Sequence, residues 1–240
     1  MTTNTNPLQL LKEQRSHVLL VLSAPRAGQE REFLPWYMGG YRAAISGAAQ
    51  VLSGQHYEQH EVDLTRGRFA GLPFKYLALY ELSLDGAEEA QSLIERIGSL
   101  HREQGVAQDP ATWLYYPMCE RVGRSPARRP SMLTFAFANA VPDKEAEFRE
   151  WYPTRHIRHA LKVPALVSGQ CFTRTRFQRA GALECTFEII AIYEQEGTPE
   201  SMLESFAALP KGALSFPAMD STPGRFAEWV YRPISADRSS

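Results

Sequence analysis

FLPWYMGGYRAAISGAAQVLSGQ, residues 33–55, returns later in the chain as FREWYPTRHIRHALKVPALVSGQ, residues 148–170. The two segments align residue for residue without a gap. Each carries a Trp-Tyr pair near its start and ends in Ser-Gly-Gln. Self-similarity of this kind indicates a duplicated structural unit, so we expect a fold built from two copies of one motif.

The segments around this block recur in the same order. Short runs rich in β-branched and aromatic residues predict strands, because such side chains suit a pleated surface. Both third strands carry a Tyr-Glu pair near the end, and both last strands are aromatic and run into proline. We expect first strands at 17–24 and 131–138, third strands at 76–82 and 187–195, and last strands at 113–117 and 229–233.

Helices are expected in the gaps between these strands. In the second copy, Asp143 is positioned to cap the helix of the repeated block, and Pro164 to end it. Asp85 and Glu88 have the spacing of a capping box in front of an apolar stripe at helical period. Thr198 is the expected N-cap of the corresponding helix in the second half.

Each half therefore has the order β-α-β-β-α-β, the split βαβ unit of ferredoxin-like folds. A sheet with helices on one face leaves the other face uncovered, and two such sheets packed together would bury it. We predict an α+β fold of two ferredoxin-like repeats, which resembles a dimeric α+β barrel made from a single chain. The expected boundaries are an N-terminal tail at 1–15, a first repeat at 16–121, a linker at 122–130 and a second repeat at 131–235.

Charge and composition argue against several partners. Lys and Arg number 26 against 27 Asp and Glu, so no basic field would attract nucleic acid or an anionic membrane. No window approaches the ~20 apolar residues of a membrane span, and the N-terminus lacks a signal-peptide pattern. No CxxC pair occurs among the cysteines, which are Cys119, Cys171 and Cys185. This favours reduced thiols in a cytoplasmic protein. We expect the three to be small, partly buried side chains.

The second copy contains a more specific pattern. Phe148, Trp151, Tyr152 and His156 give the form F-x-x-W-Y-x-x-x-H, which is followed by a Val-Pro pair and a glycine-containing strand. This pattern resembles the EthD-like members of the dimeric α+β barrel superfamily. The resemblance implies a family that includes isomerases, cyclases, decarboxylases and monooxygenases of activated aromatics, so the fold alone fixes no reaction. The first copy departs from the motif with Tyr41 in place of the histidine.

The residues of the motif suggest acid/base chemistry. On a helix Tyr152 and His156 share one face, with Trp151 beside it. An imidazole that titrates near neutrality could move a proton at a flat substrate. Arg155 would orient that substrate or stabilise negative charge, and His159 adds a further positive group. The alternative is a structural histidine and a solvated basic face that also includes Arg158.

The first copy offers aromatic and metal-ligand candidates. Trp36, Tyr37 and Tyr41 are candidate substrate contacts, although packing of the helix on its sheet explains such residues equally well. In a strand, His56, Glu58 and His60 would project to one face with a spacing that suits a divalent metal. We favour a hydrated strand face there and expect no metal, because three ligands on one strand rarely converge on one ion.

We predict a cofactor-independent lyase, isomerase or cyclase that acts on a small hydrophobic, aromatic or polyketide-like compound, with His156, Tyr152 and Arg155 as catalytic residues. The chain has no phosphate loop, G-x-S-x-G elbow or zinc CxxC pair. The alternatives are a non-catalytic binding protein and a haem protein, since some two-repeat barrels bind haem through one histidine of the second half. His156 or His159 would be that ligand. The fused chain could also pair into a homodimer.

Overall fold

The computed structural model describes residues 15–64, 74–124, 132–178, 183–210, 213–214 and 216–234. The first repeat contributes β1 (His17–Ser23), β2 (Val51–Gln59), β3 (Tyr76–Leu82) and β4 (Ala111–Pro117). The second contributes β6 (Met132–Ala138), β7 (Leu166–Arg174), β8 (Ile189–Gln195) and β9 (Phe226–Pro233). These strands agree with the ranges that the repeat predicts, to within about two residues.

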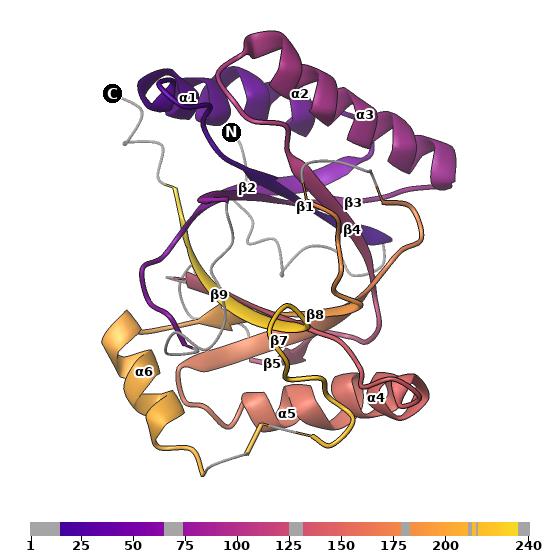
Figure 1. Cartoon of the computed structure of the whole chain (residues 1–240), viewed down its shortest axis with the longest axis vertical. Helices are drawn as coiled ribbons and strands as arrows, with labels where there is room; N and C mark the ends of the chain where they lie inside the picture. Colours follow the sequence, from indigo (N-terminus) through magenta and orange to yellow (C-terminus); the bar gives the residue numbers. More distant parts are fainter. Residues whose placement is uncertain are drawn as a thin grey trace.

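The strands form one closed, antiparallel barrel (Figure 1). Each repeat keeps the ferredoxin-like order, β4-β1-β3-β2 in the first and β9-β6-β8-β7 in the second. β2 pairs with β9 and β4 pairs with β7, so two seams join the sheets. The predicted α+β fold of two ferredoxin-like repeats in one chain is therefore confirmed.

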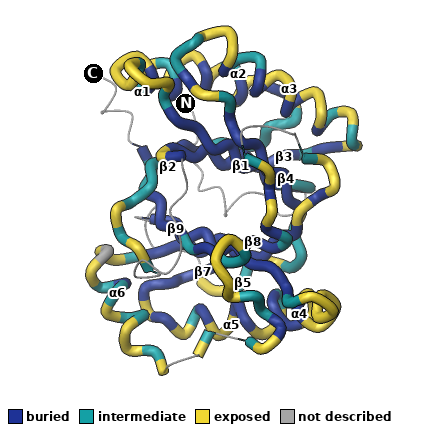
Figure 2. The backbone as a smooth tube through the Cα atoms, in the orientation of Figure 1, coloured by how far each residue is buried: buried dark blue, intermediate teal, exposed yellow. Residues whose placement is uncertain are grey.

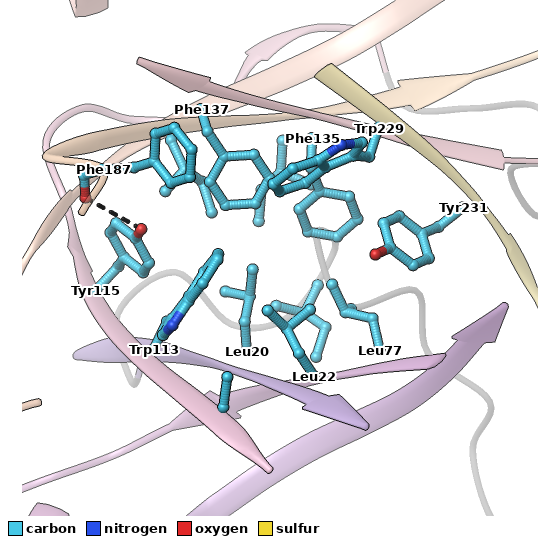
Figure 3. Close-up of a cluster of buried hydrophobic side chains, with 14 of the residues drawn as sticks. Leu20, Leu22, Leu77, Trp113, Tyr115, Phe135, Phe137, Phe187, Trp229 and Tyr231 are labelled. Atoms are coloured by element: carbon cyan, nitrogen blue, oxygen red, sulfur yellow. Dashed lines mark hydrogen bonds between the residues drawn. The ribbon is translucent and has the colours of Figure 1, made fainter. Parts of the chain in front are cut away.

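The inner faces of the two sheets meet in one apolar core, in which large aromatic side chains from both repeats converge (Figure 3). Trp113 of β4 meets Phe137 of β6 edge to face, with ring centroids 5.6 Å apart. Phe137 also packs on Trp229 of β9 at 4.5 Å. Aromatic pairs of this kind add to the hydrophobic gain of burial, so the core holds the repeats together.

Helices cover the outer faces of the barrel, and many of their residues are exposed (Figures 1 and 2). The first repeat carries α1 (Glu30–Trp36), η2 (Tyr37–Tyr41), α2 (Arg42–Ser46) and α3 (Ala87–Gln104). The second carries α4 (Glu145–Trp151), η3 (Tyr152–His156), α5 (Ile157–Ala160) and α6 (Pro199–Ala207). Both repeats contain a π turn, η2 or η3, at the same place in the repeated block, and π turns are frequent at functional sites.

A contact between a glycine and a tyrosine explains why Ser-Gly-Gln and Tyr-Glu recur. Gly54 pairs with Tyr80, and Gly169 pairs with Tyr193. A Cβ atom on Gly54 would lie 2.5 Å from the Tyr80 ring, and one on Gly169 would lie 2.6 Å from the Tyr193 ring. Each glycine is therefore needed so that the tyrosine can lie across the neighbouring strand.

One end of the barrel interior is polar. Glu81 of β3 and Glu194 of β8 occupy equivalent positions, and a serine of the neighbouring strand donates to each carboxylate. Arg15 forms a buried ion pair with Glu81, and Arg121 pairs with Glu194 at 2.7 Å. Arg15 is the last residue of the predicted N-terminal tail, and the structure makes it part of the barrel.

Local details differ from the sequence expectations at the helix ends. Thr198 caps α6 as predicted, with its hydroxyl accepting from Ser201 N. Asp143 does not cap α4, because it adopts a left-handed conformation (φ 66°) and Lys144 stands at the N-cap. The N-cap of α3 is Gly86, so the capping box predicted from Asp85 and Glu88 is wrong. Asp85 N instead donates to the carboxylate of Glu89.

The start of the predicted linker is also ordered on the barrel. Val122 and Gly123 form β5 (Val122–Gly123), which pairs with β7. The rest of that linker, from residue 125, lies outside the described residues. Within the described part of the chain no helix is long and apolar enough to cross a membrane.

Replacing Gly169 with alanine tests the glycine–tyrosine contact. We expect Gly169→Ala to lower the free energy of unfolding by about 1–3 kcal/mol, because the new methyl group overlaps the Tyr193 ring. Chemical denaturation measures the change. Gly40→Ala is the matched control, since a Cβ there meets nothing within 4 Å, and equal destabilisation by both variants would contradict the explanation.

Candidate functional site

The layer between the second sheet and its helices contains the EthD-like motif residues. Tyr152 and His156 lie at the two ends of η3, and their rings stack with centroids 4.4 Å apart. Trp151 packs against His156 at 4.9 Å and stacks on Phe216 at 4.2 Å. The motif thus forms one aromatic stack that faces the sheet, and it includes Trp151, Tyr152 and His156 as their spacing predicts.

The His156 imidazole is neutral in this stack. Its side chain is 5% exposed, and its Nδ1 atom is buried without a hydrogen-bond partner. Burial, with a smaller contribution from His159, lowers the pKa of His156 to about 3. The expectation that this imidazole titrates near neutrality therefore does not hold in the closed structure. A neutral imidazole can still donate or accept a hydrogen bond.

Glu228 of β9 is a carboxyl group in the same layer that sequence reasoning missed. Its neighbours in β9, Ala227 and Trp229, face the barrel core. Because successive side chains of a strand point to opposite faces, Glu228 faces the helices. Across the sheet it pairs with Ala136 of β6. Burial raises the pKa of the Tyr152 and Tyr193 phenols, and the negative charge of Glu228 adds to that shift.

The surroundings of Glu228 raise the pKa of its carboxyl group. Burial, assisted by the negative charge of Asp63, raises the pKa of Glu228 from 4.5 to about 7. Asp63 belongs to the segment that follows β2 in the first repeat, where Val62 and Leu64 pack on the core of the second repeat. His60 N donates to Val230 O of β9 at 2.8 Å and fixes the start of that segment. One repeat therefore supplies a charged wall for the site of the other.

The basic residues of the motif lie elsewhere. Arg155, Arg158 and His159 are exposed on the outer side of η3 and α5. The structure does not bring Arg155 or His159 to the stack that contains His156. The expectation that Arg155 orients a substrate beside His156 has no support from this placement, and a solvated basic face describes all three residues.

The candidate residues of the first repeat form a separate cluster on the opposite side of the barrel. Trp36, Tyr37 and Tyr41 pack in the helix layer of the first repeat, together with His56. His56 stacks on Tyr37 with centroids 4.4 Å apart, so an imidazole lies on the equivalent tyrosine in both repeats but comes from a different element. These residues cannot share one substrate with His156, because the whole barrel separates the two layers (Figure 1).

The three candidate metal ligands of β2 do not converge. His56 is fully buried and its Nε2 lies 2.9 Å from the Tyr80 hydroxyl. Glu58 pairs with Lys75 and Arg232. His60 lies beyond the end of β2, where its Nδ1 accepts from a backbone N–H. Among the described residues no cluster of three or more ligand-type side chains could hold a metal ion.

A sequence signal for Glu228 does exist. The last strands align as TWLYYP from Thr112 and EWVYRP from Glu228, so a carboxylate in the second repeat replaces a threonine in the first. Thr112 is buried and lies at the corresponding position of β4. A charged residue on the buried face of a strand is unusual, and this difference between repeats would have identified it.

Solved proteins share this architecture over almost their whole length. An anthrone oxidase-like protein matches with a TM-score of 0.58 at 11% identity, and the match covers 93% of each chain. A proposed monooxygenase from Fusobacterium nucleatum matches with a TM-score of 0.57 at 9% identity, over 92% of this chain and 94% of that one. A mutant chlorite dismutase from Candidatus Nitrospira defluvii matches with a TM-score of 0.53 at 10% identity, over 95% of this chain and 94% of that one.

The chain has the dimeric α+β barrel fold. Proteins with this fold carry out several different reactions, and identities this low establish the architecture alone. No protein-family model and no curated protein matches the sequence. The narrower resemblance to EthD-like proteins stays a prediction that rests on the motif.

The pKa of Glu228 predicts how stability depends on pH. The pKa of Glu228 in the folded state lies above the ordinary value of 4.5. Its protonated carboxyl therefore stabilises the fold fully below pH 4.5, and this contribution is lost as the pH rises through about 7. Between pH 5 and pH 8 the free energy of unfolding should fall in the wild type by about 1 kcal/mol more than it does in Glu228→Gln. This figure allows for the partial exposure of Glu228 to solvent. Denaturant titrations at both values measure this difference; parallel pH profiles would show that Glu228 has an ordinary pKa.

Proposed function

We propose that the chain is a cofactor-independent enzyme that moves a proton at a small, flat, hydrophobic molecule held in the helix layer of the second repeat. One observation carries the proposal: a carboxyl group, whose pKa burial raises to about 7, faces the same apolar layer as two buried phenols. Two phenol oxygens, of Tyr152 and Tyr193, and the His156 Nδ1 atom are buried there without hydrogen-bond partners. Polar atoms left unpaired in an apolar layer are available to a ligand.

The proposed reaction divides the roles among these groups. Glu228 in its carboxylate form accepts a proton from an acidic C–H or O–H bond, and the electron pair of that bond remains on the substrate. A pKa near 7 suits this task, because both protonation states are populated at neutral pH. The Tyr152 and Tyr193 hydroxyls would donate hydrogen bonds to the substrate oxygen that gains negative charge.

The remaining residues define the shape of the site. Trp151 and Phe216, stacked at 4.2 Å, provide a flat aromatic wall, and the neutral His156 imidazole extends it. Partial exposure of Glu228 connects the layer with solvent, so the carboxyl can return its proton to water after each cycle. The Asp63 charge keeps the pKa of Glu228 high and gives the first repeat a role in tuning the site.

The comparison proteins suggest a substrate class. One structure with the same fold is described as anthrone oxidase-like, and a second as a proposed monooxygenase. An anthrone is a flat carbon acid, whose CH₂ group loses a proton to give an anion spread over the ring system. A site that combines a neutral-pH base, phenol donors and an aromatic wall fits such molecules.

Deuterium exchange tests the proton transfer without requiring any later step. The purified chain is incubated with anthrone in buffered D₂O without oxygen, and loss of the CH₂ signal is followed by proton NMR. We expect exchange above the buffer rate, a decrease of about 10²-fold or more in Glu228→Gln, and a smaller decrease in Tyr152→Phe. Tyr37→Phe, the equivalent change in the first repeat, serves as the matched control and should exchange like the wild type.

The outcomes separate enzyme from binding protein. A wild-type rate in Glu228→Gln would remove Glu228 from the reaction. Stoichiometric binding of anthrone with no exchange above buffer would support a non-catalytic binding protein instead. Equal losses in Tyr152→Phe and Tyr37→Phe would show that the effect comes from general destabilisation.

The second repeat does not fit haem. An axial histidine must present a ring nitrogen to an open face that is wide enough for the macrocycle. His156 lies between Trp151 and Tyr152 with 5% of its surface exposed, and His159 is exposed on the outer side of α5. We expect that adding haemin to the purified chain produces no ligand-bound Soret band. A stoichiometric Soret shift that disappears in His156→Ala would contradict this expectation.

A further inference from the structure

Two of the three cysteines meet at the seam between β4 and β7. β4 ends at Pro117, which pairs with Phe172, and the chain then bends so that Met118 N donates to Cys171 O at 2.9 Å. The Gln170 side chain donates to Cys119 O at 2.8 Å. The segment that contains Cys119 is therefore held against the middle of β7.

Both cysteine side chains belong to one apolar cluster, the core of the second repeat, although the residues lie in different repeats. An interaction between the two thiols contributes to opposite shifts of their pKa values. Cys119 is partly buried and packs against the core of the second repeat, whereas Cys171 is fully buried in that core. Cys119 is thus the more accessible of the two residues.

The interaction makes the two thiols chemically unequal. The hydrogen bond from Cys171 lowers the pKa of Cys119 to about 7, and the nearby Arg158 acts in the same direction, while Glu120 opposes it. Burial raises the pKa of Cys171. Cys119 therefore ionises more readily than Cys171, and the thiolate is the nucleophilic form of a cysteine.

We propose that Cys119 and Cys171 form a redox-active dithiol that reacts with peroxides. The Cys119 thiolate attacks the peroxide, an S–O bond forms as the O–O bond breaks, and the leaving oxygen takes up a proton as water or an alcohol. The Cys171 thiol then attacks the sulfenic sulfur, giving the disulfide and a second water. Two thiols are oxidised by two electrons and one peroxide is reduced, so atoms and electrons balance.

The position of the pair links its redox state to the second repeat. Cys171 lies close enough to the Tyr152 and Tyr193 phenols to affect their pKa. The disulfide would also join the bend after β4 covalently to β7 and close a long chain loop, which stabilises a fold. The proposed redox chemistry of the two cysteines does not require the proton-transfer activity proposed for Glu228.

The third cysteine gives a built-in control. Cys185 is buried, and its sulfur lies 3.0 Å from the Tyr115 hydroxyl in the barrel core, where it packs away from the other two. Variants of all three positions can therefore be compared in the same chain.

Peroxide titration with peptide mapping tests the proposal. The reduced chain is treated with hydrogen peroxide, remaining thiols are alkylated, and peptides are analysed by mass spectrometry without reduction. We expect one disulfide-linked peptide that joins Cys119 to Cys171 within a single chain, with Cys185 alkylated. Cys171→Ser should stop at a sulfenic acid on Cys119 that dimedone traps, Cys119→Ser should not react at this pair, and Cys185→Ser should behave like the wild type.

Several results would overturn the dithiol. Wild-type protein that keeps all three thiols under peroxide would do so, as would a Cys119 sulfinic acid with Cys171 still alkylated. Disulfides between chains in place of the internal one would also contradict it. Thermal melting of each variant before oxidation shows whether it is folded, and Cys119→Ala provides a second variant should Cys119→Ser fail to fold.

Discussion

The inner faces of the two four-stranded sheets bury each other, and the rest of the structure depends on this contact. Neither sheet could leave its inner face in water, because most of that face is made of large apolar and aromatic side chains. The seams β2–β9 and β4–β7 close the barrel and remove the sheet edges that would otherwise be open to further pairing. Each sheet therefore depends on the other to cover its inner face.

The outer layers have fewer constraints, and there the repeats diverge. Both keep the π turn, the Trp-Tyr pair and the glycine that admits a tyrosine across the strand. Only the second adds a carboxylate, Glu228, where the first has Thr112. The first layer is filled by Tyr37, Tyr41 and His56, which pack closely on one another. The two outer layers thus share a framework and differ in the side chains that fill it.

The repeat predicted most of the fold, because strand position follows from local side-chain pattern and the pattern occurs twice. Helix caps were less predictable. Asp143 has the right side chain for an N-cap, but its backbone turns left-handed and Lys144 takes the position. A cap depends on the backbone conformation of one residue, which a pattern of side chains does not fix.

Part of the candidate site could also be predicted from local sequence pattern. The spacing of Trp151, Tyr152 and His156 placed them in one stack, since residues four apart on a helical turn lie together. The pKa of His156 could not be predicted, because it depends on burial by residues distant in the sequence. Asp63 and Glu228 are more than a hundred and fifty positions apart, and only the closed barrel brings them together.

The proposed proton transfer requires that Glu228 change its protonation state near neutral pH, and carbon-13 NMR of side-chain carboxyl groups measures that change. Chains labelled at the glutamate carboxyl carbon are titrated from pH 4 to pH 9, and Glu228→Gln assigns the signal by its disappearance. We expect a midpoint near pH 7 for Glu228 that moves downward in Asp63→Asn, because the negative charge of Asp63 contributes to the raised pKa. A midpoint near pH 4.5 that Asp63→Asn leaves unchanged would show that Glu228 is an ordinary carboxylate and not a base poised for neutral pH.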